Sequence, residues 1–175
     1  MNVELSLRSQ CLVTEMNIRQ ATISDAENLT KIIRDSYQTV ADRFGLNHSN
    51  CPKHPSNCTN EWINSDFERG VTYFILVTDG KEVGCVALEK ADHELCYLER
   101  LAVVPEYRDR GFGKFLVDYV FNEAKMRECK RISIGIISKQ QDLKNWYLRI
   151  GFREGVTTSF DHLPFDVTLM EYDIV

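Results

Sequence analysis

The sequence has no long hydrophobic run and no excess of basic residues. None of its apolar stretches approaches the roughly 20 residues that a membrane-spanning helix needs. Its 21 Lys and Arg are outnumbered by 26 Asp and Glu, which leaves a net charge of −5. An acidic protein has no overall positive field to attract nucleic acid or an anionic membrane. We therefore expect neither kind of partner.

Repeats and low-complexity tracts are also absent. The 175 residues, 43% hydrophobic and 27% charged, have the composition of an ordinary globular domain. We predict one domain over residues 16–175, preceded by an N-terminal extension over residues 1–15. The opening residues lack the continuous apolar core and cleavage site of a signal peptide, which favours a cytoplasmic location.

Cysteine is not scarce, because the chain contains six. They could form three disulfide bonds, but Cys85 and Cys96 both lie in apolar segments typical of strands, GCVAL and LCYL. A free thiol in such a segment behaves as a small hydrophobic side chain. We therefore expect free thiols and a reducing, cytoplasmic setting.

Apolar periodicity predicts a mixed order of strands and helices. The first helix is expected to begin with a capping box of Ser24 and Glu27, and the pair Asp79-Gly80 predicts a hairpin turn. Early hairpins and a later strand–helix–strand crossover predict an α/β (α+β) fold, a mixed sheet flanked by helices. The predicted strands are residues 16–22, 71–78, 81–90, 94–104, 131–138 and 167–175. The predicted helices are residues 24–40, 60–70, 112–124 and 142–151.

The segment RDRGFGK places glycines and basic residues between a predicted strand and a predicted helix. The first N–H groups of a helix have no intrahelical acceptor, and that end is partially positive. Gly111 and Gly113 let a ligand approach the amides, while Arg108, Arg110 and Lys114 add charge. The segment therefore predicts either a plain helix start or an anion site suited to a pyrophosphate. It matches neither the Walker motif nor the dinucleotide-binding fingerprint.

The longer segment LERLAVVPEYRDRGFGKFLVDYV resembles the coenzyme A-binding segment of the GNAT superfamily of N-acetyltransferases. In that family a strand reading roughly L-x-V-x-P precedes Arg/Gln-x-x-Gly-x-Gly/Ala, and Arg108, Gly111 and Gly113 occupy these places. A second family motif, Tyr-x-x-x-Gly-Phe, is present in YLRIGF, beginning at Tyr147. The resemblance extends from residue 16 to 175 and implies a mostly antiparallel central sheet. The family often has Asn seven residues before the tyrosine, where this chain has Gln140.

The resemblance implies transfer of an acetyl group from acetyl-CoA to a primary amine of a small molecule or peptide, without a metal. The amine would attack directly in a ternary complex, and a backbone N–H near Val103 would polarise the thioester. Tyr147 would protonate the leaving thiolate; its alternative role is a ring in the core. The implied coenzyme-binding residues are Leu101, Ala102, Val103, Arg108, Asp109, Arg110, Gly111, Phe112, Gly113, Lys114 and Gln140. A GNAT fold that binds coenzyme A or a partner without turnover is the alternative function, and a homodimer is compatible with either.

Glu99 is the candidate general base. Strand alternation would place Tyr97, Glu99 and Leu101 on one face, where a carboxylate among apolar neighbours needs a reason. One reason is deprotonation of the amine through water, with a pKa raised by burial. The other is a salt bridge to Arg100 or Arg131, and both readings are open at this point.

The stretch HSNCPKHPSNC contains His48, Cys51, His54 and Cys58. Four nitrogen and sulfur ligands could hold zinc, but the spacing is not that of a usual zinc knuckle and two prolines stiffen the loop. We expect a compact loop without metal. By resemblance, this region walls the acceptor pocket, and the candidates for contact with the acceptor are His54, Trp62 and His162. The alternative for a lone loop histidine is a solvated side chain.

Overall fold

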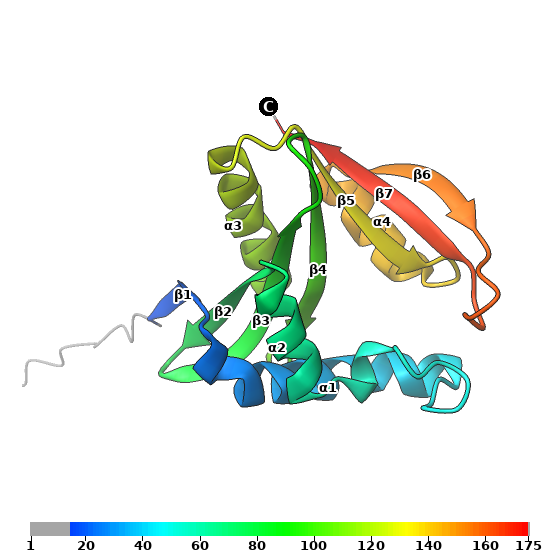
Figure 1. Cartoon of the computed structure of the whole chain (residues 1–175), viewed down its shortest axis with the longest axis horizontal. Helices are drawn as coiled ribbons and strands as arrows, with labels where there is room; N and C mark the ends of the chain where they lie inside the picture. Colours follow the sequence, from blue (N-terminus) through cyan, green and yellow to red (C-terminus); the bar gives the residue numbers. More distant parts are fainter. Residues whose placement is uncertain (1–14, 175) are drawn as a thin grey trace, which may run out of the picture.

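One sheet of seven strands organises the chain in the computed structural model, which describes residues 15–174 (Figure 1). The spatial order of the strands is β1-β2-β3-β4-β5-β7-β6. Every neighbouring pair is antiparallel except β4 and β5, which are parallel. This arrangement confirms the predicted mixed, mostly antiparallel sheet. The strands are β1 (Met16–Gln20), β2 (Thr72–Thr78), β3 (Lys81–Lys90), β4 (Leu95–Val103), β5 (Arg131–Ile137), β6 (Arg153–Thr158) and β7 (Val167–Asp173).

Helices cover both faces of this sheet (Figure 1). On one face, α1 (Ala26–Phe44) and α2 (Asn60–Glu68) pack against β2 and β3 around a buried apolar cluster. On the other face lie α3 (Phe112–Met126) and α4 (Gln141–Ile150). The four-residue apolar repeat of α3 is the reason for its packing, since it lines up side chains on one helical face that the strands bury. The N-terminal extension predicted over residues 1–15 lies outside the described residues, except for its last one.

Strands β4 and β5 pair only at their first residues and then separate. Leu95, Cys96 and Tyr97 lie opposite residues 131–133, and after these residues β4 and β5 no longer pair with each other. Figure 1 shows the two strands diverging into a wedge. The sheet therefore opens in its middle, and backbone groups along the second half of β4 face the opening.

The capping box lies two residues before the predicted one, because it begins a 3₁₀ turn (Ile23–Asp25) that leads into α1. Asp25, rather than Glu27, closes the capping box, because its carboxylate accepts a 2.8 Å hydrogen bond from the backbone N–H of Thr22. Arg19 donates to the same carboxylate at 2.7 Å and holds the pKa of Asp25 down to about 2. Both Thr22-x-x-Asp25 and Ser24-x-x-Glu27 fit the capping pattern, and the arginine on β1 favours the first.

The predicted hairpin is confirmed between β2 and β3. Asp79 (φ +49°) and Gly80 (φ +72°) both adopt left-handed backbone, which gives a two-residue turn whose twist matches that of the strands. The cysteine prediction is half right. Cys85 is a buried free thiol, as expected, but Cys96 forms a disulfide bond with Cys129. The expectation of a free thiol at Cys96 is wrong because the segment after α3 returns to the start of β4, and the sequence pattern did not show this proximity.

Candidate active site

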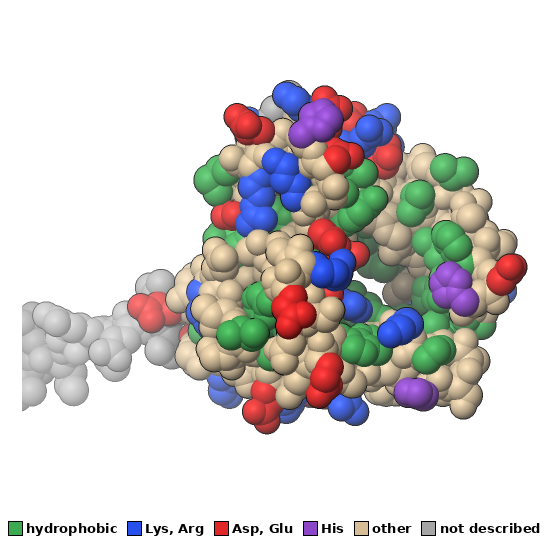
Figure 2. All heavy atoms as spheres, in the orientation of Figure 1, with side chains coloured by type: hydrophobic (Ala, Val, Ile, Leu, Met, Phe, Trp, Pro, Cys, Tyr) green, Lys and Arg blue, Asp and Glu red, His purple; other side chains and the backbone are tan. Residues whose placement is uncertain are grey.

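A cleft of about 860 Å³ occupies the wedge between β4 and β5. Figure 2 shows the hollow from outside, between the β1–β4 part of the molecule and the β5–β7 part. Its walls come from α1, the loop before α2, β4, the loop before α3, β5 and α4. These segments are far apart in the chain, so only the folded sheet brings them together.

The loop after β4 presents backbone donors to one end of this cleft. A 3₁₀ turn (Pro105–Tyr107) ends β4, and two left-handed residues, Asp109 (φ +59°) and Gly111 (φ +80°), lead into α3. Among the described residues, no oxygen accepts a hydrogen bond from the amides of residues 109–114. A Cβ atom at Gly113 would meet the Trp146 ring of α4 at 3.4 Å, an ordinary van der Waals distance, so the packing of α4 does not itself require glycine here. Free amides at a helix N-terminus form a cradle that suits phosphate oxygens.

The basic side chains of this loop are directed elsewhere. The Arg108 guanidinium donates to the backbone oxygens of Val103 at 3.1 Å and Ser36 at 2.6 Å, and so ties the loop to α1. Arg110 lies over the Tyr107 ring, outside the cleft lining. Lys114 borders the cleft but pairs with Asp118 at 2.6 Å. The cradle is therefore built mainly from backbone groups. The predicted coenzyme-binding residues that line the cleft are Leu101, Ala102, Val103, Arg108, Asp109, Gly111, Phe112, Gly113, Lys114 and Gln140.

A bulge in β4 corrects the predicted face of Leu101. The pairing of β4 with β3 shifts register at this point, and Arg100 takes up left-handed backbone (φ +52°). The extra residue returns Leu101 to the face that packs on α3 and α4, together with Leu98. Glu99 lies opposite Ala87 and faces α1 and α2. The prediction that Glu99 and Leu101 share a face is therefore wrong.

Glu99 lines the cleft as a partly buried carboxylate. Burial raises its pKa above the ordinary value of 4.5. Neither arginine of the salt-bridge alternative pairs with it, because Arg131 pairs with Glu171 at 3.2 Å and the carboxylate paired with Arg100 is that of Asp66. Within residues 15–174, Glu99 has no ion pair at all, which leaves its oxygens available to a ligand or water.

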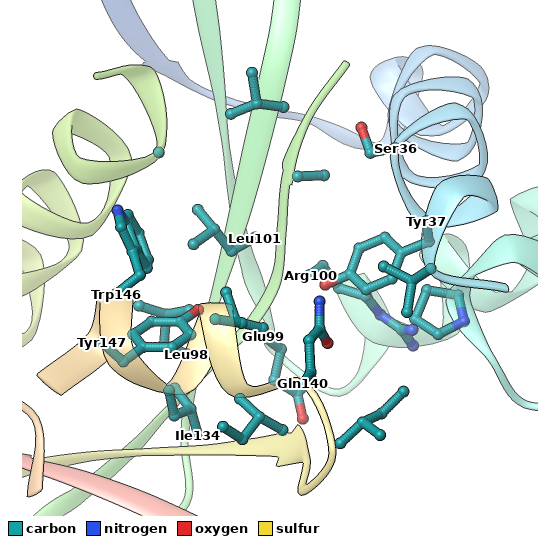
Figure 3. Close-up of a pocket in the computed structure, with 18 of the residues that line it drawn as sticks. Ser36, Tyr37, Leu98, Glu99, Arg100, Leu101, Ile134, Gln140, Trp146 and Tyr147 are labelled. Carbon is teal, nitrogen blue, oxygen red and sulfur yellow. The ribbon is translucent and has the colours of Figure 1, made fainter. Parts of the chain in front are cut away.

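Tyr147 faces Glu99 across the cleft. Its ring is only 4% exposed and packs edge-on against Trp146 and Phe152, with centroids 4.8 and 5.1 Å away. Figure 3 shows its hydroxyl pointing into the cleft on the side of Glu99. Among the described residues, none forms a hydrogen bond with this hydroxyl. Burial raises the pKa of the phenol well above its usual range, so it carries its proton at neutral pH.

The wall opposite Tyr147 contains residues that the sequence patterns missed. Figure 3 shows Tyr37 and Arg100 on one side of the cleft, Trp146 and Tyr147 on the other, and Glu99 and Gln140 between them. Gln140 precedes α4, and its N–H donates to the oxygen of Ile137 at 2.8 Å. Tyr37 carried no sequence signal beyond helical spacing. Arg100 could have been noticed as a second charge in an apolar strand.

The His-Cys stretch contributes two residues, His54 and Pro55, to the lining of the cleft. His54 is buried beside the cleft, and its Nδ1 lies 2.9 Å from the hydroxyl of Ser56. No group of three or more His, Cys, Asp or Glu side chains in the described part of the chain is placed to hold a metal. Trp62 contacts Arg100 but does not line the cleft, and His162 is also absent from its lining.

Residues 28–152 match the model of the acetyltransferase (GNAT) family. The chain belongs to this family. A curated relative, the uncharacterized N-acetyltransferase of the pepI 3′ region of Lactobacillus delbrueckii subsp. lactis, is 27% identical over 140 residues, covering 71% of this chain and 79% of its own length. The described helices include none that is long and apolar enough to cross a membrane.

Two solved structures share the fold of this GNAT protein. The ribosomal-protein-S18-alanine N-acetyltransferase of Escherichia coli superposes with a TM-score of 0.73 at 16% identity, over 91% of this chain and 94% of that one. A GNAT family acetyltransferase from Elizabethkingia anophelis with acetyl-CoA bound has a TM-score of 0.64 at 18% identity, over 90% and 97%. Nearly the whole fold of these two structures is therefore present in this chain.

Proposed function

We propose that this GNAT protein transfers the acetyl group of acetyl-CoA directly to a primary amine of a small molecule or peptide. The observation that carries the proposal is the arrangement of three features around one cleft. The free amides of residues 109–114 lie at its end, and a buried phenol and a carboxylate without an ion pair face each other within it.

The coenzyme has a matching site along β4. The amides of residues 109–114 would donate to its pyrophosphate, and Leu101 would pack against the pantetheine arm. Val104 donates its N–H to Val83 on β3, so the N–H of Val103 points to the other edge of β4, toward the wedge. This N–H would polarise a thioester carbonyl lying in the opening.

Two side chains supply the proton transfers that acetylation of an amine requires. Glu99 would receive the amine proton, through water, as the nitrogen forms its bond to the acetyl carbon. Tyr147 would donate its proton to the sulfur as the carbon–sulfur bond breaks. A carboxylate without an ion pair and a protonated phenol are the states that these roles need.

The proposal is tested by measuring thiol release from acetyl-CoA with a panel of primary amines, together with calorimetric titration of acetyl-CoA. We expect binding and amine-dependent release of coenzyme A. Binding without turnover of any amine would instead support a coenzyme-binding module, and absence of binding would overturn the proposed function.

A further inference from the structure

Arg100 is a partly buried cation of the cleft wall, and its guanidinium makes no hydrogen bond with any residue between 15 and 174. Its side chain is 20% exposed, and its Nε is buried without any partner in the described residues. The nearest carboxylate oxygen, Oδ2 of Asp66, is 4.0 Å from Nη2, beyond hydrogen-bond distance. Burying a guanidinium with unmade hydrogen bonds is costly, so a ligand that completes them would bind favourably.

Asp66 is already occupied by other donors. It accepts hydrogen bonds from the hydroxyl of Tyr73 at 2.6 Å and from Arg69 at 2.5 Å. Tyr73 is fully buried, which fixes the carboxylate in place. Asp66 therefore offsets part of the charge of Arg100 but leaves its buried Nε without an acceptor among the described residues.

A second cation, Lys53, shares the indole ring of Trp62 with Arg100. The Arg100 guanidinium lies 5.8 Å from the centre of the Trp62 ring, and the ammonium of Lys53 lies 5.2 Å from the same ring. Figure 2 shows Lys and Arg side chains near the mouth of the hollow, with Asp and Glu side chains beside them. The indole holds the flat guanidinium in one orientation, as a fixed fork for an anion.

The bulge places Arg100 beside the candidate base. Glu99 faces the α1–α2 side of β4, and Arg100 contacts Trp62 and Asp66 of α2 on that same side. Figure 3 shows Glu99 between Arg100 and Tyr147. An acceptor whose amine lies at Glu99 would therefore hold its neighbouring groups near the guanidinium.

We infer that Arg100 binds a carboxylate of the acceptor, so that the substrate is an amino acid or another amine with a carboxylate a few bonds from its nitrogen. This inference rests on the proposed acetyltransferase function. A guanidinium and a carboxylate form paired, charge-assisted hydrogen bonds in matching geometry. The same cation disfavours polyamines and other acceptors that carry several positive charges.

The test pairs each acid with its amide. Free amino acids and dipeptides, and their C-terminal amides, are compared as acceptors of the acetyl group from acetyl-CoA by thiol release. We expect the best acid to exceed its own amide at least about 100-fold in kcat/KM, mainly through KM. Amides that match or exceed their acids, or acceptors without a carboxylate that exceed both, would overturn the inference while the acetyltransferase function stands.

Two substitutions assign the preference to Arg100. Arg100→Gln should bring the ratio of acid to amide to within about threefold of unity, and Arg100→Lys should retain part of it. The matched control is Arg153→Gln, which removes an exposed arginine that pairs with Asp173 on the far strands. A ratio that persists in Arg100→Gln contradicts the inference, and retained binding of acetyl-CoA shows that the variant is folded.

Direct binding separates this inference from the chemistry. The acids and amides are titrated calorimetrically into the native protein without coenzyme, and into the Arg100→Gln variant. Acids that bind the native chain alone support the inference even where no turnover occurs, although the proposed function then fails. Absence of both acid binding and acid turnover overturns it.

Discussion

The two sides of the cleft hold a ligand in different ways. On the α3 side, the cradle consists of backbone amides from one short segment, with side chains that pair with the protein itself. On the α1 side, the wall is made of side chains, including Tyr37, His54, Glu99 and Arg100, brought together from distant segments. Backbone recognition depends on local geometry, and side-chain recognition depends on the whole fold. Under the proposed function, the first side would bind the constant coenzyme and the second a particular acceptor.

The largest effect is expected from a carboxylate placed in the cradle. Gly111 has φ +80° with open space around its Cβ position, so Gly111→Glu combines backbone strain with repulsion of phosphate. We expect acetyl-CoA affinity to fall on the order of 1,000-fold in calorimetric titration, about 4 kcal/mol. Gly80→Glu is the matched control, because Gly80 has φ +72° and equal space but lies in the hairpin turn. Equal losses in both variants would mean that strain, not the cradle, is responsible.

Removal of the phenol hydroxyl should affect the reaction and not the binding of coenzyme. We expect Tyr147→Phe to lower kcat about 100-fold, in the range typical of a lost general acid, with the Kd of acetyl-CoA unchanged. The control Tyr119→Phe removes a hydroxyl on α3 that lies outside the cleft lining. Unchanged turnover in Tyr147→Phe would exclude Tyr147 as the acid.

Neutralising the carboxylate on the acceptor side should have a smaller effect, because water can replace part of the role of a general base. We expect Glu99→Gln to lower kcat/KM about 30-fold. In the native enzyme, activity should fall as the pH drops through the pKa of Glu99, which burial raises above 4.5, since only the ionised carboxylate accepts a proton. This acidic limb should disappear in Glu99→Gln and persist in Glu68→Gln, an exposed site at the end of α2. If the acidic limb of the pH–activity profile survives in Glu99→Gln, a group other than Glu99 is responsible for it.

The smallest effect concerns stability on the acceptor side. Burial, aided by the charge of Arg100, lowers the pKa of His54 from 6.5 to about 4, so the unfolded chain binds its proton more readily than the native one. The resulting stability is complete above pH 6.5 and is lost as pH falls toward 4. We expect the free energy of unfolding, measured by chemical denaturation, to fall by about 1–2 kcal/mol between these pH values. This is less than the full pKa difference implies, because the cleft is open to solvent. His54→Asn should remove this slope, and a slope that remains would contradict the assignment. Asp25, with a pKa of about 2, contributes only below this range.

The sequence predicted the backbone side of the cleft better than the side-chain side. The cradle was predictable because its glycines and basic residues lie within seven positions, and Tyr147 because its motif is local. The bulge at Arg100 was not, since a strand pattern of period two contains no mark of an inserted residue. Tyr37 was missed for another reason, because a helical tyrosine shows its neighbours only when the sheet is formed. The bond of Cys96 to Cys129 likewise depends on where β4 begins relative to the end of α3.

The central claim is that the backbone after β4 binds the coenzyme pyrophosphate, and hydrogen exchange of the amides of residues 109–114 tests it most directly. These amides have no acceptor among the described residues and should exchange rapidly in the free protein. With saturating acetyl-CoA, we expect their exchange to slow at least about tenfold, as donors that gain an acceptor become protected. Saturation by acetyl-CoA with unchanged exchange over residues 109–114 would contradict the account.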